Sequence, residues 1–146
     1  MKNRVEVIHG VNFDVLERRD PAMYGGLSLM ELEVRIKGFA HEFGFEPSFS
    51  QTNHEGEFCE LLHRAPEMAD GLILNPGAWT HYSYAIRDAL DVSGLPAIEV
   101  HLSAIEDREG WRAQSVIRDL VVGVVSGKGP DGYRDAVEML RAELGS

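Results

Sequence analysis

Short apolar runs alternate along the chain with longer stretches in which apolar residues recur every three or four positions. Five of the short runs have the length and residue types of β-strands, and they cover residues 4–9, 45–51, 71–74, 97–100 and 120–126. Four of the longer stretches are typical of amphipathic helices, and they cover about 29–43, 55–69, 82–92 and 131–144. The first helix is expected to begin after Ser28, which forms a capping box with Glu31, and to end at Gly44.

This alternation predicts the fold class. Helices between buried apolar strands are typical of an α/β protein whose parallel sheet is covered on both faces, and right-handed crossovers leave few topologies. We therefore predict a flavodoxin-like three-layer sandwich, with a five-stranded parallel sheet of order 2-1-3-4-5 in a single domain over residues 1–146. Ligands of such sheets bind outside the carboxyl ends of the strands, so the site is expected just after strands one, three and four.

The composition narrows the function classes. The 146 residues carry a formal net charge of −10, which argues against a nucleic-acid partner, because phosphate binding requires basic patches. The longest apolar runs are far shorter than the roughly 20 residues of a membrane helix, and the N-terminus shows no secretory signal. One cysteine, Cys59, cannot form an internal disulfide, so we expect a cytoplasmic protein with no membrane partner.

The connection after the first strand is longer than the usual strand-to-helix connection of about two to six residues. It includes residues 17–26, with Arg18, Arg19 and Tyr24, and it ends on two glycines. A long loop with glycine at one end is typical of a lid, and an arginine beside the tyrosine would favour the phenolate form, which can act as a base. The alternative is a solvated loop in which Tyr24 is only a packing anchor, and loop composition alone leaves both interpretations open.

Polar residues also follow the third strand. Asn75 begins a turn, and His81 comes shortly before the next helix. Amides at the start of that helix can bind an anion or a polarised oxygen. Asn75 and His81 are therefore either ligands of a small molecule, or a helix cap and a surface imidazole.

The end of the fourth strand predicts an acid–base pair. Strand alternation places Glu99, His101 and Ser103 on one side. A glutamate beside a histidine fixes its tautomer and favours its protonated form, so His101 is a candidate general acid, although a hydrogen-bonded core histidine would have the same neighbours. Arg108 and Arg112 follow in the next loop and could hold a carboxylate or hydroxyl groups.

Two further patterns indicate neither a cofactor nor a metal. Residues 127–132 match the glycine spacing of a dinucleotide-binding turn, but they follow the last predicted strand and do not open a βαβ unit. Six histidines are present without an H-E-x-x-H motif or a closely spaced cysteine–histidine set. We therefore predict that the protein needs no metal and no cofactor, and that Cys59 has a structural or incidental place in a helix.

Together these clusters resemble type II 3-dehydroquinate dehydratase, a small flavodoxin-like enzyme of the shikimate and quinate pathways. The resemblance covers nearly the whole chain, and it is carried by Arg19-Asp20-Pro21 with Tyr24-Gly25, by Gln51-Thr52-Asn53-His54-Glu55-Gly56-Glu57, by Asn75-Pro76-Gly77-Ala78 with Thr80-His81, by Arg87-Asp88 with Ala89-Leu90, and by Glu99-Val100-His101-Leu102-Ser103. Several separate motifs in one order argue against a chance match.

The resemblance implies an elimination of water from 3-dehydroquinate through an enolate, which gives 3-dehydroshikimate. It implies that Tyr24 is the base and that Arg19 favours its phenolate form, while Asn12 holds a water that assists the enolate. It also implies that His101, oriented by Glu99, protonates the departing hydroxyl. One base, one acid and enolate stabilisation are what an elimination beside a ketone requires.

The resemblance further implies a substrate-binding set and an oligomer. The expected substrate-binding residues are Asn75, His81, Leu102, Ser103 and Arg112. Ser103 and nearby amides would hold the substrate carboxylate. Asp88 would come from a neighbouring subunit, because the family assembles as trimers grouped into a dodecamer.

The chain departs from the family pattern at several positions. After the first strand the family usually has Asn-Gly-Pro-Asn-Leu-Asn, where this chain has His9-Gly10-Val11-Asn12-Phe13-Asp14; Glu17 replaces a lid glycine and Ala104 an asparagine. A related enzyme acting on a modified dehydroquinate is therefore the main rival hypothesis. A phosphoacceptor signalling module would need an aspartate in place of Asn75, and a flavin binder would need a Ser/Thr/Gly-rich loop after the first strand.

Overall fold

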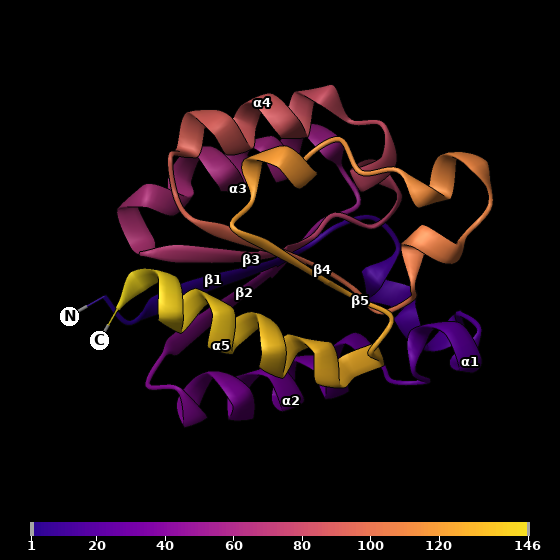
Figure 1. Ribbon diagram of the computed structural model, residues 1–146, viewed down its shortest axis with the longest axis horizontal. Coiled ribbons are helices and arrows are strands. Elements are labelled where there is room, and N and C mark those ends of the chain that lie inside the picture. Colours follow the sequence, from indigo (N-terminus) through magenta and orange to yellow (C-terminus); the bar gives the residue numbers. More distant parts are fainter. Residues whose placement is uncertain (1, 146) are drawn as a thin grey trace.

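The strands form one parallel sheet of order β2-β1-β3-β4-β5. In the computed structural model (Figure 1), which describes residues 2–145, they are β1 (Arg4–His9), β2 (Glu46–Gln51), β3 (Gly71–Asn75), β4 (Ala97–His101) and β5 (Gly123–Ser126). His9 at the end of β1 pairs with Gln51 of β2 on one side and with Asn75 of β3 on the other. The predicted strand order and direction are confirmed; the first and last residues of the predicted domain lie outside the described residues.

Helices cover both faces of this sheet, which gives three layers (Figure 1). One face carries α3 (Glu55–Met68) and α4 (Tyr84–Ser93), and the other carries α2 (Leu29–Glu42) and α5 (Gly132–Leu144). A short helix, α1 (Pro21–Tyr24), lies beyond the carboxyl ends of the strands. None of the helices within residues 2–145 has the length and apolar character that a membrane crossing requires.

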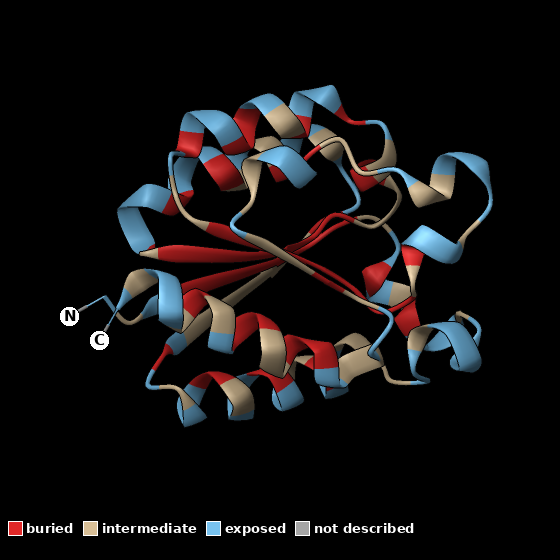
Figure 2. Cartoon of the chain, in the orientation of Figure 1, coloured by how far each residue is buried: buried red, intermediate tan, exposed pale blue. Residues whose placement is uncertain are grey.

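Alternate residues of the strands supply two separate cores. Figure 2 shows the buried residues along the strands and on the inward sides of the helices. Val7 of β1 packs with Ile36 of α2 below the sheet, whereas its neighbour Ile8 packs with Ile86 of α4 above it. Full burial of each such side chain contributes about 1.5–3 kcal/mol. The strands are therefore fixed on both faces, and the residues at their carboxyl ends are held in place.

The start of α2 is fixed by local hydrogen bonds. The Ser28 hydroxyl accepts from the backbone N–H of Glu31 at 3.2 Å, and the Glu31 carboxylate accepts from the backbone N–H of Ser28 at 2.9 Å. This reciprocal pair is the predicted capping box. The helix ends at Glu42, and Gly44 follows with a φ of 78°, a left-handed conformation that favours glycine.

The structure departs from the sequence-based prediction by more than one residue at three places. Helix α4 begins at Tyr84, because the Ser83 hydroxyl caps it by accepting from Ile86 N–H at 3.1 Å. The fifth strand begins at Gly123, because Arg118–Leu120 forms a 3₁₀ turn. The predicted loop after β1 is partly helical: it contains the 3₁₀ turn Phe13–Arg18 and then α1, whose N-cap is the Asp20 side chain. Proline at the first position of α1 has its φ already set for a helix, which the apolar pattern does not reveal.

Candidate active site

The carboxyl ends of β1, β3 and β4 border a cavity of about 350 Å³. Nine of the eleven residues predicted for the site line it, namely Asn12, Arg19, Tyr24, Asn75, His81, His101, Leu102, Ser103 and Arg112. The cavity lies where parallel α/β sheets bind their ligands. The two remaining residues are Glu99, which lies behind His101, and Asp88, which lies on α4 outside the cavity.

One wall of the cavity holds Tyr24 between two arginines. Arg19 Nη2 donates to the Tyr24 hydroxyl at 2.7 Å, and its guanidinium carbon lies 4.1 Å from the centre of the Tyr24 ring. Arg108 Nη1 donates to the same hydroxyl at 3.3 Å. The pKa of Arg108 is raised, first of all by this hydrogen bond to Tyr24. Two positive charges beside one phenol oxygen stabilise negative charge on that oxygen.

At the end of β4 a carboxylate lies beside an imidazole, whereas Tyr24 lies beside two cations. Glu99 is fully buried, and its Oε2 lies 2.5 Å from Nε2 of His101. The other carboxylate oxygen of Glu99 has no hydrogen-bond partner within residues 2–145. The carboxylate can only accept, so Nε2 of His101 carries a proton and Nδ1 is the ring nitrogen left for the cavity. A buried carboxylate in this position stabilises an imidazolium ion more than an exposed one would.

Asn75 and His81 are held by the backbone at the floor of the cavity. Asn75 Oδ1 accepts from the backbone N–H of Gly77 at 3.2 Å. His81 Nδ1 lies 2.6 Å from the carbonyl oxygen of Gln114, which can only accept, so Nδ1 is the protonated nitrogen and Nε2 is an acceptor. The pKa of His81 is lowered, mainly by burial and further by the neighbouring cations, so this ring is neutral at pH 7. The Trp111 ring packs edge-on against His81, with 5.3 Å between ring centres.

The turn that follows β1 places Asn12 at the entrance. Its φ of 71° is the only left-handed value for a non-glycine residue within the described part of the chain. The backbone N–H of Asn12 donates to Asn53 Oδ1 at 2.8 Å, and Asn53 Nδ2 donates to Asp14 at 2.9 Å. Asparagine tolerates this conformation better than most residues. Asp14, one of the departures from the family pattern, therefore helps to hold the backbone of Asn12.

Ser103 and Arg112 complete the lining on the side of the loop after β4. The Ser103 hydroxyl accepts from Arg108 Nη1 at 3.3 Å. Arg112 pairs with Glu109 at 3.0 Å, and its guanidinium lies over the Trp111 ring. Arg108 also pairs with Glu109, at 3.6 Å, so both arginines line the cavity while part of their charge is already balanced.

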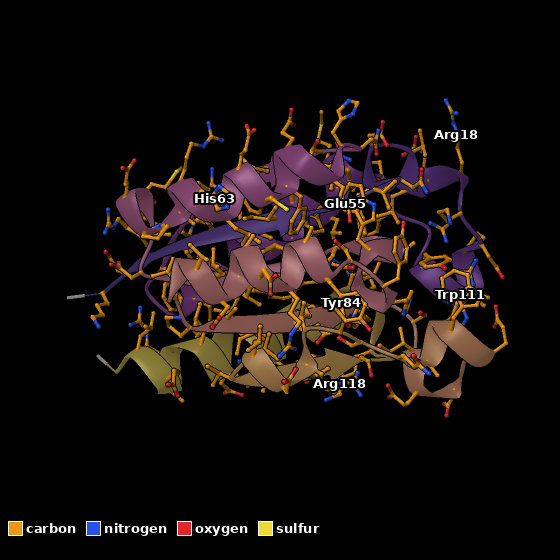
Figure 3. The ribbon with its side chains drawn as sticks, turned by 90° about the horizontal axis from the view of Figure 1, so that it is seen from above. Arg18, Glu55, His63, Tyr84, Trp111 and Arg118 are labelled. Atoms are coloured by element: carbon orange, nitrogen blue, oxygen red, sulfur yellow. The ribbon has the colours of Figure 1, made fainter. Side chains whose placement is uncertain are left out.

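Glu17 and Asp88 do not line the cavity of this chain. Glu17 forms no ion pair with any of the described residues, so it neither neutralises Arg18 nor draws Arg19 away from Tyr24. Figure 3 shows the Arg18 side chain pointing away from the molecule. Asp88 is exposed on α4 and reaches no residue of the cavity in its own chain.

The contact between Arg108 and the Tyr24 hydroxyl was not predicted from the sequence. The sequence offered Arg108, with Arg112, only as a binder of carboxylate or hydroxyl groups. It stands 84 positions after Tyr24, and no periodicity links the two residues. The only available signal was an arginine close to the end of a strand that carries an acid–base pair.

No three histidine, cysteine, aspartate or glutamate side chains among residues 2–145 lie close enough together to hold a metal ion. The residues 127–132 that resemble a dinucleotide-binding turn adjoin the N-terminus of α5 and contribute nothing to the cavity that contains Tyr24.

Comparison with known proteins identifies the family of the chain. Residues 3–141 match the family described as Dehydroquinase class II. The chain is 45% identical to a 3-dehydroquinate dehydratase of Pelotomaculum thermopropionicum, with 98% of this chain and 99% of that protein covered. It is 47% identical to 3-dehydroquinate dehydratase 2 of Pseudomonas putida, with 94% and 92% covered. A crystal structure of a type II dehydroquinase from Butyrivibrio crossotus superposes with a TM-score of 0.90 at 38% identity, covering 96% of this chain and 98% of that one. The chain therefore belongs to the class II dehydroquinase family.

Proposed function

We propose that the protein is a 3-dehydroquinate dehydratase, a hydro-lyase that converts 3-dehydroquinate to 3-dehydroshikimate. A proton leaves the carbon beside the ketone, an enolate forms, and the hydroxyl group departs as water to leave an enone. The observation that carries the proposal is the cavity itself, because it joins the Tyr24 hydroxyl, held by two guanidinium groups, with a His101 imidazole that is paired with a buried carboxylate. These two groups are the base and the acid that such an elimination needs.

In this proposal Tyr24 removes the proton. Arg19 and Arg108 stabilise its phenolate form by hydrogen bonds of 2.7 and 3.3 Å. The enolate oxygen that develops is stabilised by a water held by Asn12, whose backbone is fixed by Asn53. Stabilisation of developing negative charge is among the largest contributions to catalysis of this type.

His101 supplies the proton for the departing hydroxyl. Glu99 holds the imidazole through Nε2, so the proton is delivered from Nδ1, which is the nitrogen free to face the cavity. The buried carboxylate balances the imidazolium charge before transfer. After transfer the ring returns to a neutral form with its proton on Nε2.

The substrate is held by the remaining polar groups of the cavity. Its hydroxyl groups are bound by Asn75, by Nε2 of His81 and by Arg112, which are all partly or wholly fixed by backbone or side-chain contacts. Its carboxylate is bound by Ser103 with the backbone amide of Leu102. The cations at the cavity counteract the net charge of −10, which would otherwise repel an anionic substrate.

The proposal includes an oligomer, with trimers assembled into a dodecamer, in which Asp88 enters the site of a neighbouring subunit. What supports it is the exposed position of Asp88 on α4, where the side chain is open to a second copy. We propose that the enzyme acts in the cytoplasm, in the shikimate or the quinate pathway.

The test is an ultraviolet assay of enone formation from 3-dehydroquinate by the purified protein. We expect saturable turnover that is lost in the double variant Tyr24→Phe/His101→Ala. Absence of turnover in a folded protein, together with turnover of an analogue that is altered at a hydroxyl group, would contradict the proposed substrate and favour a related hydroaromatic acid.

A further inference from the structure

Behind the cavity, on the sheet face that carries α5, lies a fully buried histidine that the elimination itself does not use. His9, the last residue of β1, is wholly inaccessible to solvent, and its Nε2 lies 2.7 Å from the hydroxyl oxygen of Tyr133 in α5, which is equally buried. His9 also stacks on Phe13, which lines the cavity, with 4.7 Å between ring centres.

This buried pair reaches Asn75, the residue opposite His9 in the sheet. Asn75 Nδ2 lies 3.5 Å from the Tyr133 hydroxyl oxygen, at the outer limit of a hydrogen bond. The other end of the Asn75 amide, Oδ1, accepts from Gly77 N–H. The contacts with Tyr133 and Gly77 therefore fix the orientation of the Asn75 amide, with Nδ2 toward Tyr133 and Oδ1 toward Gly77.

The protons of this chain of contacts can be assigned by counting donors and acceptors. Within residues 2–145 the Tyr133 hydroxyl meets only His9 Nε2 and Asn75 Nδ2, and the amide nitrogen can only donate. If Tyr133 donates to Nε2, one polar group stays unpaired, namely the N–H at Nδ1 of His9, which has no partner among these residues. If Nε2 carries the proton instead, both the tyrosine O–H and the Nδ1 lone pair are unpaired. Unpaired buried groups are costly, so the first arrangement is favoured.

The charge states agree with this assignment. Burial lowers the pKa of His9 to about 3, so the imidazole is neutral and can accept at Nε2. Burial also raises the pKa of Tyr133, so its proton stays on the oxygen. Two neutral groups thus share one well-defined hydrogen bond.

We propose that His9 is a positioning residue: by accepting the Tyr133 hydroxyl proton at Nε2, it turns the tyrosine oxygen into an acceptor for Asn75 Nδ2 and so fixes the direction in which the Asn75 amide meets the substrate. With Oδ1 on Gly77 and one Nδ2 hydrogen on Tyr133, the second Nδ2 hydrogen is the donor left for a substrate hydroxyl. The kinetic part of this inference rests on the proposed function; the assignment of the proton does not.

The first test is kinetic and uses Tyr133→Phe, which keeps the ring that packs the core and removes only the hydroxyl. Asn75 binds a part of the substrate that does not react, so KM for 3-dehydroquinate should rise about three- to thirtyfold while kcat changes less than about threefold. A purely structural role would lower the thermal midpoint or the active fraction and leave KM unchanged. An unchanged KM in the folded variant would overturn the proposal.

His9 variants provide the matched set. Glutamine can place an acceptor oxygen near the position of Nε2, so His9→Gln should keep KM within about threefold of the wild-type value, whereas His9→Leu should raise KM as Tyr133→Phe does. Combining His9→Leu with Tyr133→Phe should add little further, because both changes remove the same contact. His63→Leu, an exposed position on α3 (Figure 3), controls for replacement of a histidine in general. Equal KM effects of His9→Gln and His9→Leu would contradict the inference.

The second test needs no substrate, so it separates this inference from the proposed function. Nitrogen-15 chemical shifts of the histidine rings should assign to His9 a protonated Nδ1 and an unprotonated Nε2. In Tyr133→Phe the Nε2 signal should move, because its hydrogen-bond donor is gone. A protonated Nε2 in the wild-type protein would overturn the assignment even if the enzyme turned over 3-dehydroquinate as proposed.

Discussion

The cavity has two sides that are built differently. On the strand side, Asn75, Glu99 and His101 are all buried, stand at the ends of central strands and are tied to backbone or to other buried groups. On the loop side, Arg19 and Tyr24 are only half-buried, and they lie on a short turn and the four-residue helix α1. The proposed acid and the proposed substrate-binding groups are therefore held in place by the core, while the proposed base, Tyr24, is carried by a segment with few buried neighbours of its own.

This contrast separates two catalytic requirements. Proton delivery to a leaving group needs a fixed tautomer and a compensating charge. A buried strand end provides both before the substrate binds, so these groups need no reorganisation during the reaction. The segment that carries Tyr24 must let an anionic substrate enter and must then cover it, which is the task of a lid. Gly25 and Gly26, with φ values of 91° and 75°, provide the backbone conformations at which α1 ends.

The largest effect is expected on the loop side, from Tyr24→Phe. The change removes the phenol oxygen and keeps the ring under the Arg19 guanidinium, so ligand binding should persist. Turnover should fall by about 10²- to 10⁴-fold, the range for loss of a general base. The measurement is kcat by enone absorbance, with the dissociation constant of a competitive inhibitor as the control for binding. A variant that keeps more than about a tenth of wild-type activity would exclude Tyr24 as the base.

A smaller effect, on stability, is expected on the strand side. The pKa of His9 is lowered from 6.5 to about 3 by burial, so between these values the unfolded chain binds a proton that the folded chain does not. Stability contributed by the neutral ring is thus fully present above about pH 6.5 and is lost as the pH falls toward 3. At about pH 5 the loss is on the order of 2 kcal/mol.

Denaturant unfolding of wild type and His9→Gln at one protein concentration measures this loss. The wild-type free energy of unfolding should fall by about 2 kcal/mol more than that of the variant between about pH 7.5 and pH 5. The other titrating groups are shared by both proteins and cancel in the comparison. Parallel pH profiles would show that His9 is not held neutral in the folded state.

A modest effect is expected from Glu17→Gly on the loop side. Glu17 makes no ion pair within the described residues, and Arg19 already contacts Tyr24, so no inhibitory pair has to be broken. The gain in kcat/KM should be less than about tenfold, or under roughly 1.4 kcal/mol. The rate against pH, compared with that of Glu17→Gln, separates the charge from the backbone freedom of glycine. A hundredfold gain would show that Glu17 suppresses the dehydratase reaction.

The smallest effect is expected from chelation. The proposed base, acid and oxyanion-stabilising groups are all protein side chains or water, so exhaustive treatment with EDTA should leave kcat unchanged within about 1.5-fold. The assay is run before and after dialysis against the chelator. Loss of activity that returns with a divalent ion would contradict the prediction that no metal is needed.

The two sides of the cavity were also unequally predictable from sequence. Residues at the ends of apolar strands, such as Asn75 and His101, follow from the period of two and from the shared edge of a parallel sheet. Contacts between elements that lie far apart in the sequence carry no period: the approach of Arg108 to Tyr24 and that of Tyr133 to His9 span 84 and 124 positions. Only packing of the complete fold decides such pairs.

Two local features, the capping box at Ser28 and helix α1, differed in how well the sequence predicted them. The capping box at Ser28 was predicted because its hydrogen bonds join near neighbours. Helix α1 was not predicted, because four residues are too few to show an apolar period, although Asp20 and Pro21 form a recognisable helix start. Sequence therefore indicates a site more reliably where backbone periodicity places the side chains.

The proposed roles of the two sides, with Tyr24 as the base and His101 as the acid, can be tested by hydrogen exchange at the reacting carbon. In deuterated water, His101→Ala should still exchange the proton beside the ketone of 3-dehydroquinate through Tyr24, while elimination is slowed by about 10²-fold or more. Tyr24→Phe should show neither exchange nor elimination above the level of the double variant, which serves as the control for spontaneous exchange. Proton NMR of the recovered substrate gives the result directly. Exchange that persists in Tyr24→Phe and disappears in His101→Ala would reverse the proposed roles and contradict the account.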